Sequence, residues 1–208
     1  TQKVNFTFLP EHNIHHKMAA VVKTKYGFGH YIIPLTGQGR YSMNYYSTTE
    51  NKSEQQLKSA LNTKLAQGYN SLGYNTARDQ MFMNIDNKKN NGQSASVNTL
   101  ECIYTGTTIT GYSDRQAAQN GNPQFNTEHT FPQGHFNSNE PMRSDMHHLF
   151  PTTNTSNSQR GNDPFGLVSN PTWNSGGSKS GGSTFEPRDA QKGATARAMM
   201  YFVLRYQD

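Results

Sequence analysis

The chain has 208 residues and a formal net charge of +5; 32% of its residues are hydrophobic and 16% are charged. This length fits a single domain that is large enough to bury a core, and the mean hydropathy of −0.89 predicts that many polar loops surround it. Cys102 is the only cysteine, which excludes an internal disulfide. No apolar run is long enough to cross a membrane. The positive net charge favours a polyanionic partner.

Residues 1–40 form a first segment, which we interpret as an N-terminal extension of uncertain role ahead of a domain at residues 41–208. Short apolar-polar alternations at residues 4–8 and 31–33, separated by glycines, predict short strands. No cysteine or carboxylate pattern supports a defined metal site around the three histidines of this segment, so we interpret them as part of a polar loop; they are His12, His15 and His16.

Two helices are predicted next. Apolar residues recur at helical spacing from Ser53 onward, Ser53 and Gln56 form a candidate capping box, and Gly68 ends the pattern. A second, shorter helix is predicted over residues 76–82. The Asn-rich tract at residues 86–92 that follows is predicted to be a loop, because it lacks the oxygen spacing of a calcium-binding loop.

The middle of the chain is predicted to form short strands. Residues 97–110 indicate strand, turn and strand, with Gly106 at the turn, and residues 114–120 can form one or two helical turns. Residues 125–131 are too few for a globular helix and are stopped by Pro132, so they are predicted to be the end of a strand.

The last third is predicted to return to the same sheet and then become helical. Residues 145–149 should form the second strand or a turn leading into it, and residues 155–160 a helix with Thr155 or Ser156 as N-cap. The Gly-rich residues 170–184 are predicted to be a flexible surface loop. A final helix should begin near Pro187, which suits a first helical turn. The fold class is therefore α+β, with mixed helices and short strands.

Three short stretches carry residue types suited to phosphodiester chemistry. They read FNTEHTFP at residues 125–132, SDMHHLFP at residues 144–151 and NSQRGN at residues 157–162. A histidine can accept a proton near neutral pH, Glu and Asn oxygens suit a hard divalent cation, and arginine suits a phosphate oxygen. For the Glu-His pair alone, coincidence would be the better interpretation.

Together, these stretches closely resemble the endonuclease I family of secreted and periplasmic bacterial nucleases, part of the His-Me finger (ββα-metal) superfamily. The resemblance begins near Tyr41 and includes LECIYTG at residues 100–106 and FEPRD at residues 185–189. It implies a ββα-metal core within the α+β fold. It also implies cleavage of DNA, with RNA as a further substrate, to 5′-phosphate ends.

The resemblance also implies the roles of individual residues. His129 would be the general base, and Glu128 and Asn157 would be the two side-chain ligands of a single Mg²⁺, with Ca²⁺ or Mn²⁺ as substitutes. Because adjacent strand residues point to opposite faces, Glu128 and His129 can serve one phosphate only at a strand end or bulge. Asn157 and Arg160, at helical spacing of three, should share one face of their helix.

The arginine that contacts the scissile phosphate is less defined by the pattern. Arg143 is favoured over Arg160, for which a structural salt bridge is an alternative. His147 is assigned a supporting or packing role rather than metal binding, and Asp145 the orientation of a neighbouring loop or side chain.

The resulting hypothesis is a sequence-tolerant, metal-dependent endonuclease that is secreted or periplasmic and monomeric, with no membrane partner. No helix-turn-helix or zinc finger is visible, and phosphate contacts carry no sequence information. The alternative is a catalytically inactive nucleic-acid-binding module of a larger secreted protein. Retention of His129, Glu128 and Asn157 together argues against that alternative.

Overall fold

The computed structural model describes residues 16–22, 31–37 and 47–206 of the chain. It divides into two compact units, Thr1–Ser47 and Thr48–Asp208. In the first unit, β1 (His16–Val22) pairs antiparallel with β2 (Tyr31–Gly37). The predicted strand at residues 4–8 and two of the three histidines, His12 and His15, lie outside the described residues.

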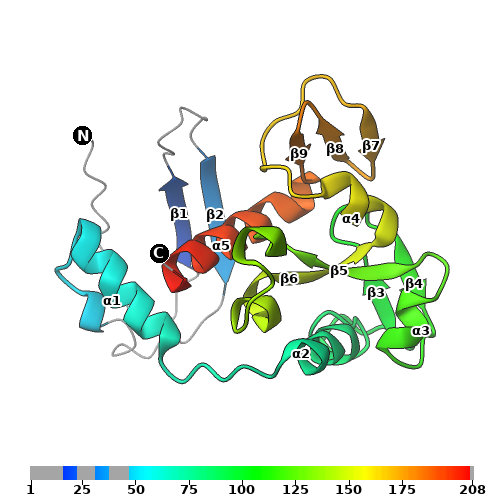
Figure 1. Ribbon diagram of the computed structural model, residues 1–208, viewed down its shortest axis with the longest axis horizontal. Helices are drawn as coiled ribbons and strands as arrows, with labels where there is room; N and C mark the ends of the chain where they lie inside the picture. The colour runs from blue at the N-terminus through cyan, green and yellow to red at the C-terminus, as the bar shows by residue number, and fades with distance from the viewer. Residues whose placement is uncertain (1–15, 23–30, 38–46, 207–208) are drawn as a thin grey trace. The chain divides into compact units, whose positions relative to one another are not determined.

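The second unit combines helices with small antiparallel sheets, and the predicted α+β class is confirmed (Figure 1). Its α-helices are α1 (Glu54–Ala66), α2 (Tyr74–Gln80), α3 (Arg115–Gln119), α4 (Asn154–Arg160) and α5 (Asp189–Arg205). Its strands are β3 (Thr99–Glu101), β4 (Thr108–Thr110), β5 (Phe125–His129), β6 (Leu149–Thr153), β7 (Trp173–Ser175), β8 (Ser178–Gly181) and β9 (Thr184–Glu186). Single turns of other helix types lie at η1 (Ser47–Thr49), η2 (Met81–Ile85), η3 (Gln133–Phe136), η4 (Met142–Ser144) and η5 (Met146–His148).

The pair β5–β6 with the helix that follows it is the part of the fold that positions the site. The two strands are antiparallel, with Phe125 opposite Thr153 and His129 opposite Leu149. The helix α4 starts directly after β6 and packs against both strands. Its N-cap is Thr153, whose side chain accepts a hydrogen bond from the Ser156 backbone N–H, and so the predicted N-caps were wrong.

The hydrophobic core lies between this pair, α2 and the turn after β3. It is small because the chain is polar, and aromatic side chains supply much of it. Its buried members include Met81, Phe82, Leu100, Cys102, Tyr104, Phe125, Leu149 and Phe185. The single thiol, that of Cys102, is buried in this core.

The helix predictions agree with the structure at most positions. Ser53 is the N-cap of α1, although its side chain makes no capping hydrogen bond, and Gly68 follows the helix end with a φ of +73°. The final helix starts at Asp189, so Pro187 precedes its first turn instead of lying within it.

One loop prediction is wrong, and one strand prediction is confirmed in its second form. Residues 170–184 are not a flexible loop: they contain β7 and β8, which form a three-stranded sheet with β9. Residues 146–148 form the turn η5, which leads into the second strand at Leu149, as the second form of the prediction had it; Asp145 caps the turn by accepting the His147 backbone N–H.

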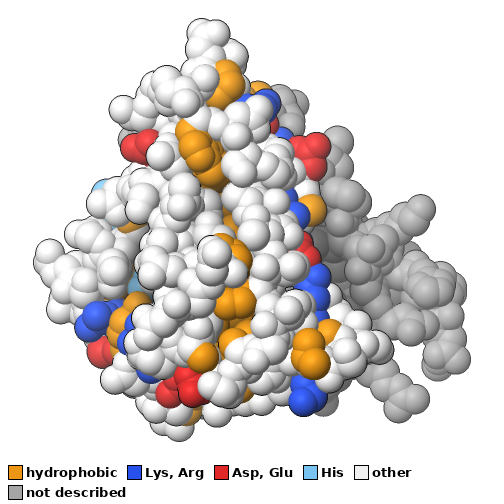
Figure 2. Space-filling model, turned by 90° about the vertical axis from the view of Figure 1, so that its right-hand side faces the viewer, with side chains coloured by type: hydrophobic (Ala, Val, Ile, Leu, Met, Phe, Trp, Pro, Cys, Tyr) orange, Lys and Arg blue, Asp and Glu red, His pale blue; other side chains and the backbone are white. Residues whose placement is uncertain are grey.

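The visible surface is mainly neutral. On the face shown in Figure 2, backbone and uncharged polar groups dominate, and lysines and arginines are scattered among acidic side chains. None of the helices that the structure describes has the length and apolar character needed to span a membrane.

Candidate active site

Glu128 and His129 occupy the last two positions of β5, so the Glu-His pair lies at a strand end, as predicted. The register with β6 is regular through both residues, and no bulge is needed. Successive side chains of a strand point to opposite faces. Accordingly, the two residues contact different neighbours, and a substrate that meets both must approach the end of the strand.

Glu128 is buried, with 3% of its surface exposed, and it faces α4. Its Oε1 accepts a hydrogen bond of 2.7 Å from the Tyr104 hydroxyl and lies 3.1 Å from the Nε atom of Arg160. Burial raises the pKa of the carboxyl to about 7, although Arg160 and Tyr104 both act to lower it. Both contacts use Oε1, which leaves Oε2 as the oxygen available to a cation.

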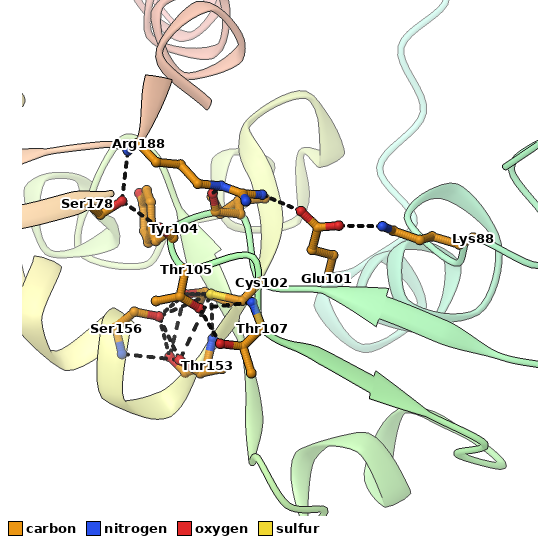
Figure 3. A network of polar contacts seen from close by, with 12 residues as sticks. Lys88, Glu101, Cys102, Tyr104, Thr105, Thr107, Thr153, Ser156, Ser178 and Arg188 are labelled. Atoms are coloured by element: carbon orange, nitrogen blue, oxygen red, sulfur yellow. Dashed lines mark hydrogen bonds and ion pairs between the residues drawn. The ribbon is translucent and has the colours of Figure 1, made fainter. Parts of the chain in front are cut away.

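Tyr104 is held in place by the turn that follows β3 (Figure 3). Its backbone carbonyl accepts a hydrogen bond of 2.6 Å from Ser178 of β8, and the neighbouring Ile103 carbonyl accepts one from Arg188. Arg188 also pairs with Glu101, which pairs with Lys88. The turn ends at Gly106, where φ is +74° and a Cβ would lie 2.6 Å from the Arg188 guanidinium, so glycine is required there.

The same turn is joined to the start of α4 through Cys102. The buried thiol lies 3.2 Å from the Ser156 hydroxyl and accepts the Thr153 backbone N–H (Figure 3). The turn that carries Tyr104 and the helix that carries Asn157 are therefore fixed relative to each other.

His129 is also buried, but it faces the turn η4 and α2. Its Nε2–H donates a 3.1 Å hydrogen bond to the backbone carbonyl of Arg143, because a carbonyl can only accept. This fixes the tautomer and leaves Nδ1 with its lone pair. Burial, together with the nearby His148, lowers the pKa of His129 to about 3, so the ring is neutral near pH 7.

Arg143 lies beside this imidazole and stacks on an aromatic ring. Its guanidinium carbon is 4.1 Å from the centre of the Tyr74 ring, and that ring is 5.6 Å from the His129 ring. A second guanidinium, that of Arg78 in α2, also lies 4.1 Å from the centre of the Tyr74 ring. The sequence analysis identified Arg143 but missed Tyr74 and Arg78. The helix α2 carries no motif, and it lies about 50 residues upstream of His129.

Asn157 and Arg160 lie on α4, and their environments differ. Arg160 has 1% of its surface exposed and donates hydrogen bonds to the carbonyls of Thr130 and Gly161. Its Nε–H is not aligned with Glu128, so their contact is electrostatic. Asn157 is half-buried, and its carboxamide has no hydrogen bond to any described residue.

Asp145 and His147 lie away from Glu128, next to α5. The buried Asp145 carboxylate accepts hydrogen bonds from the hydroxyls of Tyr201 and Tyr206 and from the Nδ1–H of His147. Burial alone would raise the pKa of Asp145, but these hydrogen bonds lower it to about 2. Asp145 therefore joins the turn η5 to the last helix and to the residue that follows it; the orienting role predicted for it stays a prediction.

The oxygen donors of Glu128 and Asn157 fit a hard divalent cation. One carboxylate and one carboxamide suit Mg²⁺, which keeps much of its water shell. Within residues 47–206, no three His, Cys, Asp or Glu side chains form a metal site of their own. A cation bound by Glu128, with Asn157 as the second candidate ligand, would favour the ionised form of the Glu128 carboxyl.

The fold and this set of side chains define an α+β protein with a histidine, a carboxylate and arginines gathered around one strand end. The chain matches the model of the Endonuclease I family over residues 53–208, which is well over half of its length. The chain belongs to the endonuclease I family. The family prediction is thus confirmed, and the prediction of a nuclease-type hydrolase is confirmed at the level of the family.

Two curated relatives are both described as an extracellular ribonuclease. That of Bacillus amyloliquefaciens is 29% identical over 167 residues, which covers 78% of this chain and 53% of the relative. That of Bacillus subtilis (strain 168) is 28% identical over 166 residues, covering 78% and 54% respectively. The chain therefore spans about half the length of the curated relatives it matches.

Proposed function

We propose that the chain is a metal-dependent endonuclease that hydrolyses phosphodiester bonds of nucleic acids with little sequence preference. The observation that carries this proposal is the state of His129: a neutral imidazole, fixed through Nε2, next in the chain to a buried carboxylate. In this proposal the β5–β6–α4 unit is the ββα-metal core of the His-Me finger superfamily.

His129 acts as the general base. Its Nδ1 accepts the proton of the attacking water, while the Arg143 carbonyl holds the ring and stabilises the imidazolium that forms. General-base catalysis of this kind contributes about 10²- to 10⁴-fold. Attack at phosphorus breaks the bond to the 3′ oxygen and leaves 5′-phosphate ends.

Glu128 and Asn157 hold a single Mg²⁺-type ion, which supplies charge stabilisation to the phosphate when bound. Tyr104 and Arg160 keep the Glu128 carboxylate in place and favour its ionised form. Ca²⁺ or Mn²⁺ would be the substitutes to test.

Arg143 is the better candidate for the phosphate contact. It is partly exposed and lies beside His129, whereas Arg160 is buried and engaged with two carbonyls and Glu128. We therefore assign to Arg160 the positioning of Glu128, and to Arg143 the orientation of the phosphate.

DNA and RNA are both proposed substrates. Contacts confined to the phosphate do not distinguish sequences, and the description of both relatives as extracellular ribonucleases adds weight to RNA. That description also supports secretion. Monomeric state and the absence of a membrane partner stay predictions.

Cleavage assays test the proposal. Plasmid DNA and a structured RNA, each incubated with Mg²⁺, should be cut, and EDTA should stop cleavage. His129→Ala should abolish cleavage while circular dichroism stays unchanged, and Arg197→Ala, at an exposed position of α5, should cut normally. Near-normal turnover of His129→Ala would refute the assignment of the base. Binding without cleavage under any divalent ion would favour the inactive-module alternative.

A further inference from the structure

Two arginines converge on one aromatic ring beside the proposed base. Arg78 and Arg143 each place their guanidinium carbon 4.1 Å from the centre of the Tyr74 ring. Both charges act on His129 and contribute to its lowered pKa. Arg78 comes from α2, so the cluster joins this helix to the turn η4.

The charges of this cluster are not neutralised within the part of the chain that the structure describes. Neither arginine forms an ion pair there, and the Nε–H groups of both are buried without a hydrogen-bond partner. The neighbouring carboxylate, Asp79, is already paired with Arg115 at 2.6 Å. Two like charges held near each other without a counter-ion repel each other, and an anion bound beside them would relieve this repulsion.

We propose that Arg78, held beside Arg143 by the Tyr74 ring, forms a subsite for a second backbone phosphate of the substrate, adjacent to the scissile phosphate that Arg143 orients. This inference rests on the proposed function, because it extends the same substrate surface. Arginine suits the role because its planar guanidinium can donate two parallel hydrogen bonds to phosphate oxygens.

The alternative role for Tyr74, stacking on a nucleobase, is disfavoured by the same contacts. Base stacking needs a free ring face, and two guanidinium groups already contact this ring. Cation–π contact holds the arginines in place. Nη2 of Arg78 donates a 2.6 Å hydrogen bond to the Asn75 side chain, which leaves its Nη1 and the guanidinium of Arg143 for an anion. The subsite should therefore recognise the backbone and be indifferent to the base.

Salt-dependent binding tests this subsite without requiring cleavage. Binding of a fluorescent oligonucleotide is measured by anisotropy in EDTA over a range of NaCl concentrations, for wild type, Arg78→Gln, Arg78→Lys and the matched control Arg197→Gln. Arg78→Gln should lose one phosphate contact and therefore bind the oligonucleotide more weakly than wild type. The magnitude of its slope of log K against log salt should be smaller by about 0.9 for duplex DNA or about 0.7 for single strands. Arg78→Lys, which keeps the charge, should restore most of the slope, and Arg197→Gln should match wild type.

A second measurement uses the unmodified protein, in case Arg78→Gln fails to fold. Modification of each arginine by phenylglyoxal is measured by mass spectrometry. Bound oligonucleotide should protect Arg78 from modification, while the exposed Arg197 stays reactive. An unchanged salt slope in folded Arg78→Gln, unprotected Arg78, or no oligonucleotide binding by wild type would overturn the subsite. Wild type that binds with the expected slope but never cleaves would refute the proposed function and leave the subsite standing.

Discussion

Arg160 and Glu128 form an ion pair between α4 and β5 in which both side chains are almost completely buried. A charge removed from water in this way needs its partner, because desolvation costs several kcal/mol per ion. The guanidinium therefore makes it possible to keep a carboxylate in the protein interior at the strand end. The proposed metal ion would require a carboxylate at this same position, which Glu128 occupies.

Replacing Arg160 should destabilise the protein in a pH-dependent way. Arg160→Met leaves the Glu128 carboxylate buried without a counter-charge, and breaking such a pair costs about 3–5 kcal/mol. The loss should be smaller at about pH 5 than at about pH 8. The raised pKa of Glu128 keeps its carboxyl neutral at the lower of these two pH values. Urea unfolding at both pH values measures this. Arg197→Met is the control and should change stability by less than about 0.5 kcal/mol. Equal losses at the two pH values would contradict a charge effect.

Glu128 should also make stability depend on pH when no divalent ion is present. Its pKa is raised from 4.5 to about 7, so the folded state binds this proton more tightly than the unfolded state. The resulting stabilisation is complete below about pH 4.5 and is lost as the pH rises through about 7. Buried His129 has the opposite dependence over part of this range, so the difference between wild type and Glu128→Gln is the quantity to measure.

In EDTA, thermal melts should show Glu128→Gln gaining stability relative to wild type as the pH rises from about 5 to about 8. Mg²⁺ should stabilise wild type but not Glu128→Gln at the higher pH, because a cation favours the ionised carboxylate. The gain of Glu128→Gln relative to wild type should therefore be reversed when Mg²⁺ is present. A pH-independent difference in EDTA would show that Glu128 titrates normally.

The sequence was sufficient to name the candidate site residues, but not the contacts that support them. Glu128, His129, Asn157 and Arg160 are readable because they lie in short stretches with defined spacing. The helix predicted over residues 155–160 is confirmed, and it carries both Asn157 and Arg160. Tyr104 could not be assigned in this way. Its contact with Glu128 spans 24 residues and depends on a turn whose position is fixed by β8 and Arg188.

The three-stranded sheet at residues 173–186 was missed for a related reason. Its strands contain Ser, Lys and Gly, which have low strand propensity, so local composition indicated a loop. Tertiary packing overrides that preference: Phe185 is fully buried, and the Trp173 ring stacks on it at 6.1 Å between centres. Glycine-rich turns at Gly176 and Gly182, both with positive φ, join the strands.

Tyr104→Phe should shift the pH dependence of activity with little change in fold. The hydroxyl hydrogen bond lowers the pKa of Glu128, so its removal should raise that pKa. If the ionised carboxylate is needed, the acid limb of kcat/KM should move to higher pH, while the rate on the alkaline side stays close to wild type. The measurement is a pH profile at fixed Mg²⁺. A uniform loss of rate at every pH would mean that Tyr104 acts in some other way.

Asp145→Asn should loosen the attachment of α5 and thereby disturb the turn that carries Arg143. The carboxylate is fully buried and accepts hydrogen bonds from two tyrosines and His147; a hydrogen bond to a charged group contributes about 1.5–3 kcal/mol. Because its pKa is lowered to about 2, this stabilisation is present above pH 3.8 and is lost as the pH falls through about 2. Asp145→Asn should therefore unfold at lower urea concentration at pH 7 and differ less from wild type in acid.

Asp145→Asn should also lower the pKa of His147, which hydrogen bonding to Asp145 raises, and NMR titration of the His147 ring can follow this change. An unchanged His147 titration in the folded variant would show that the hydrogen bond between the two side chains does not persist in solution.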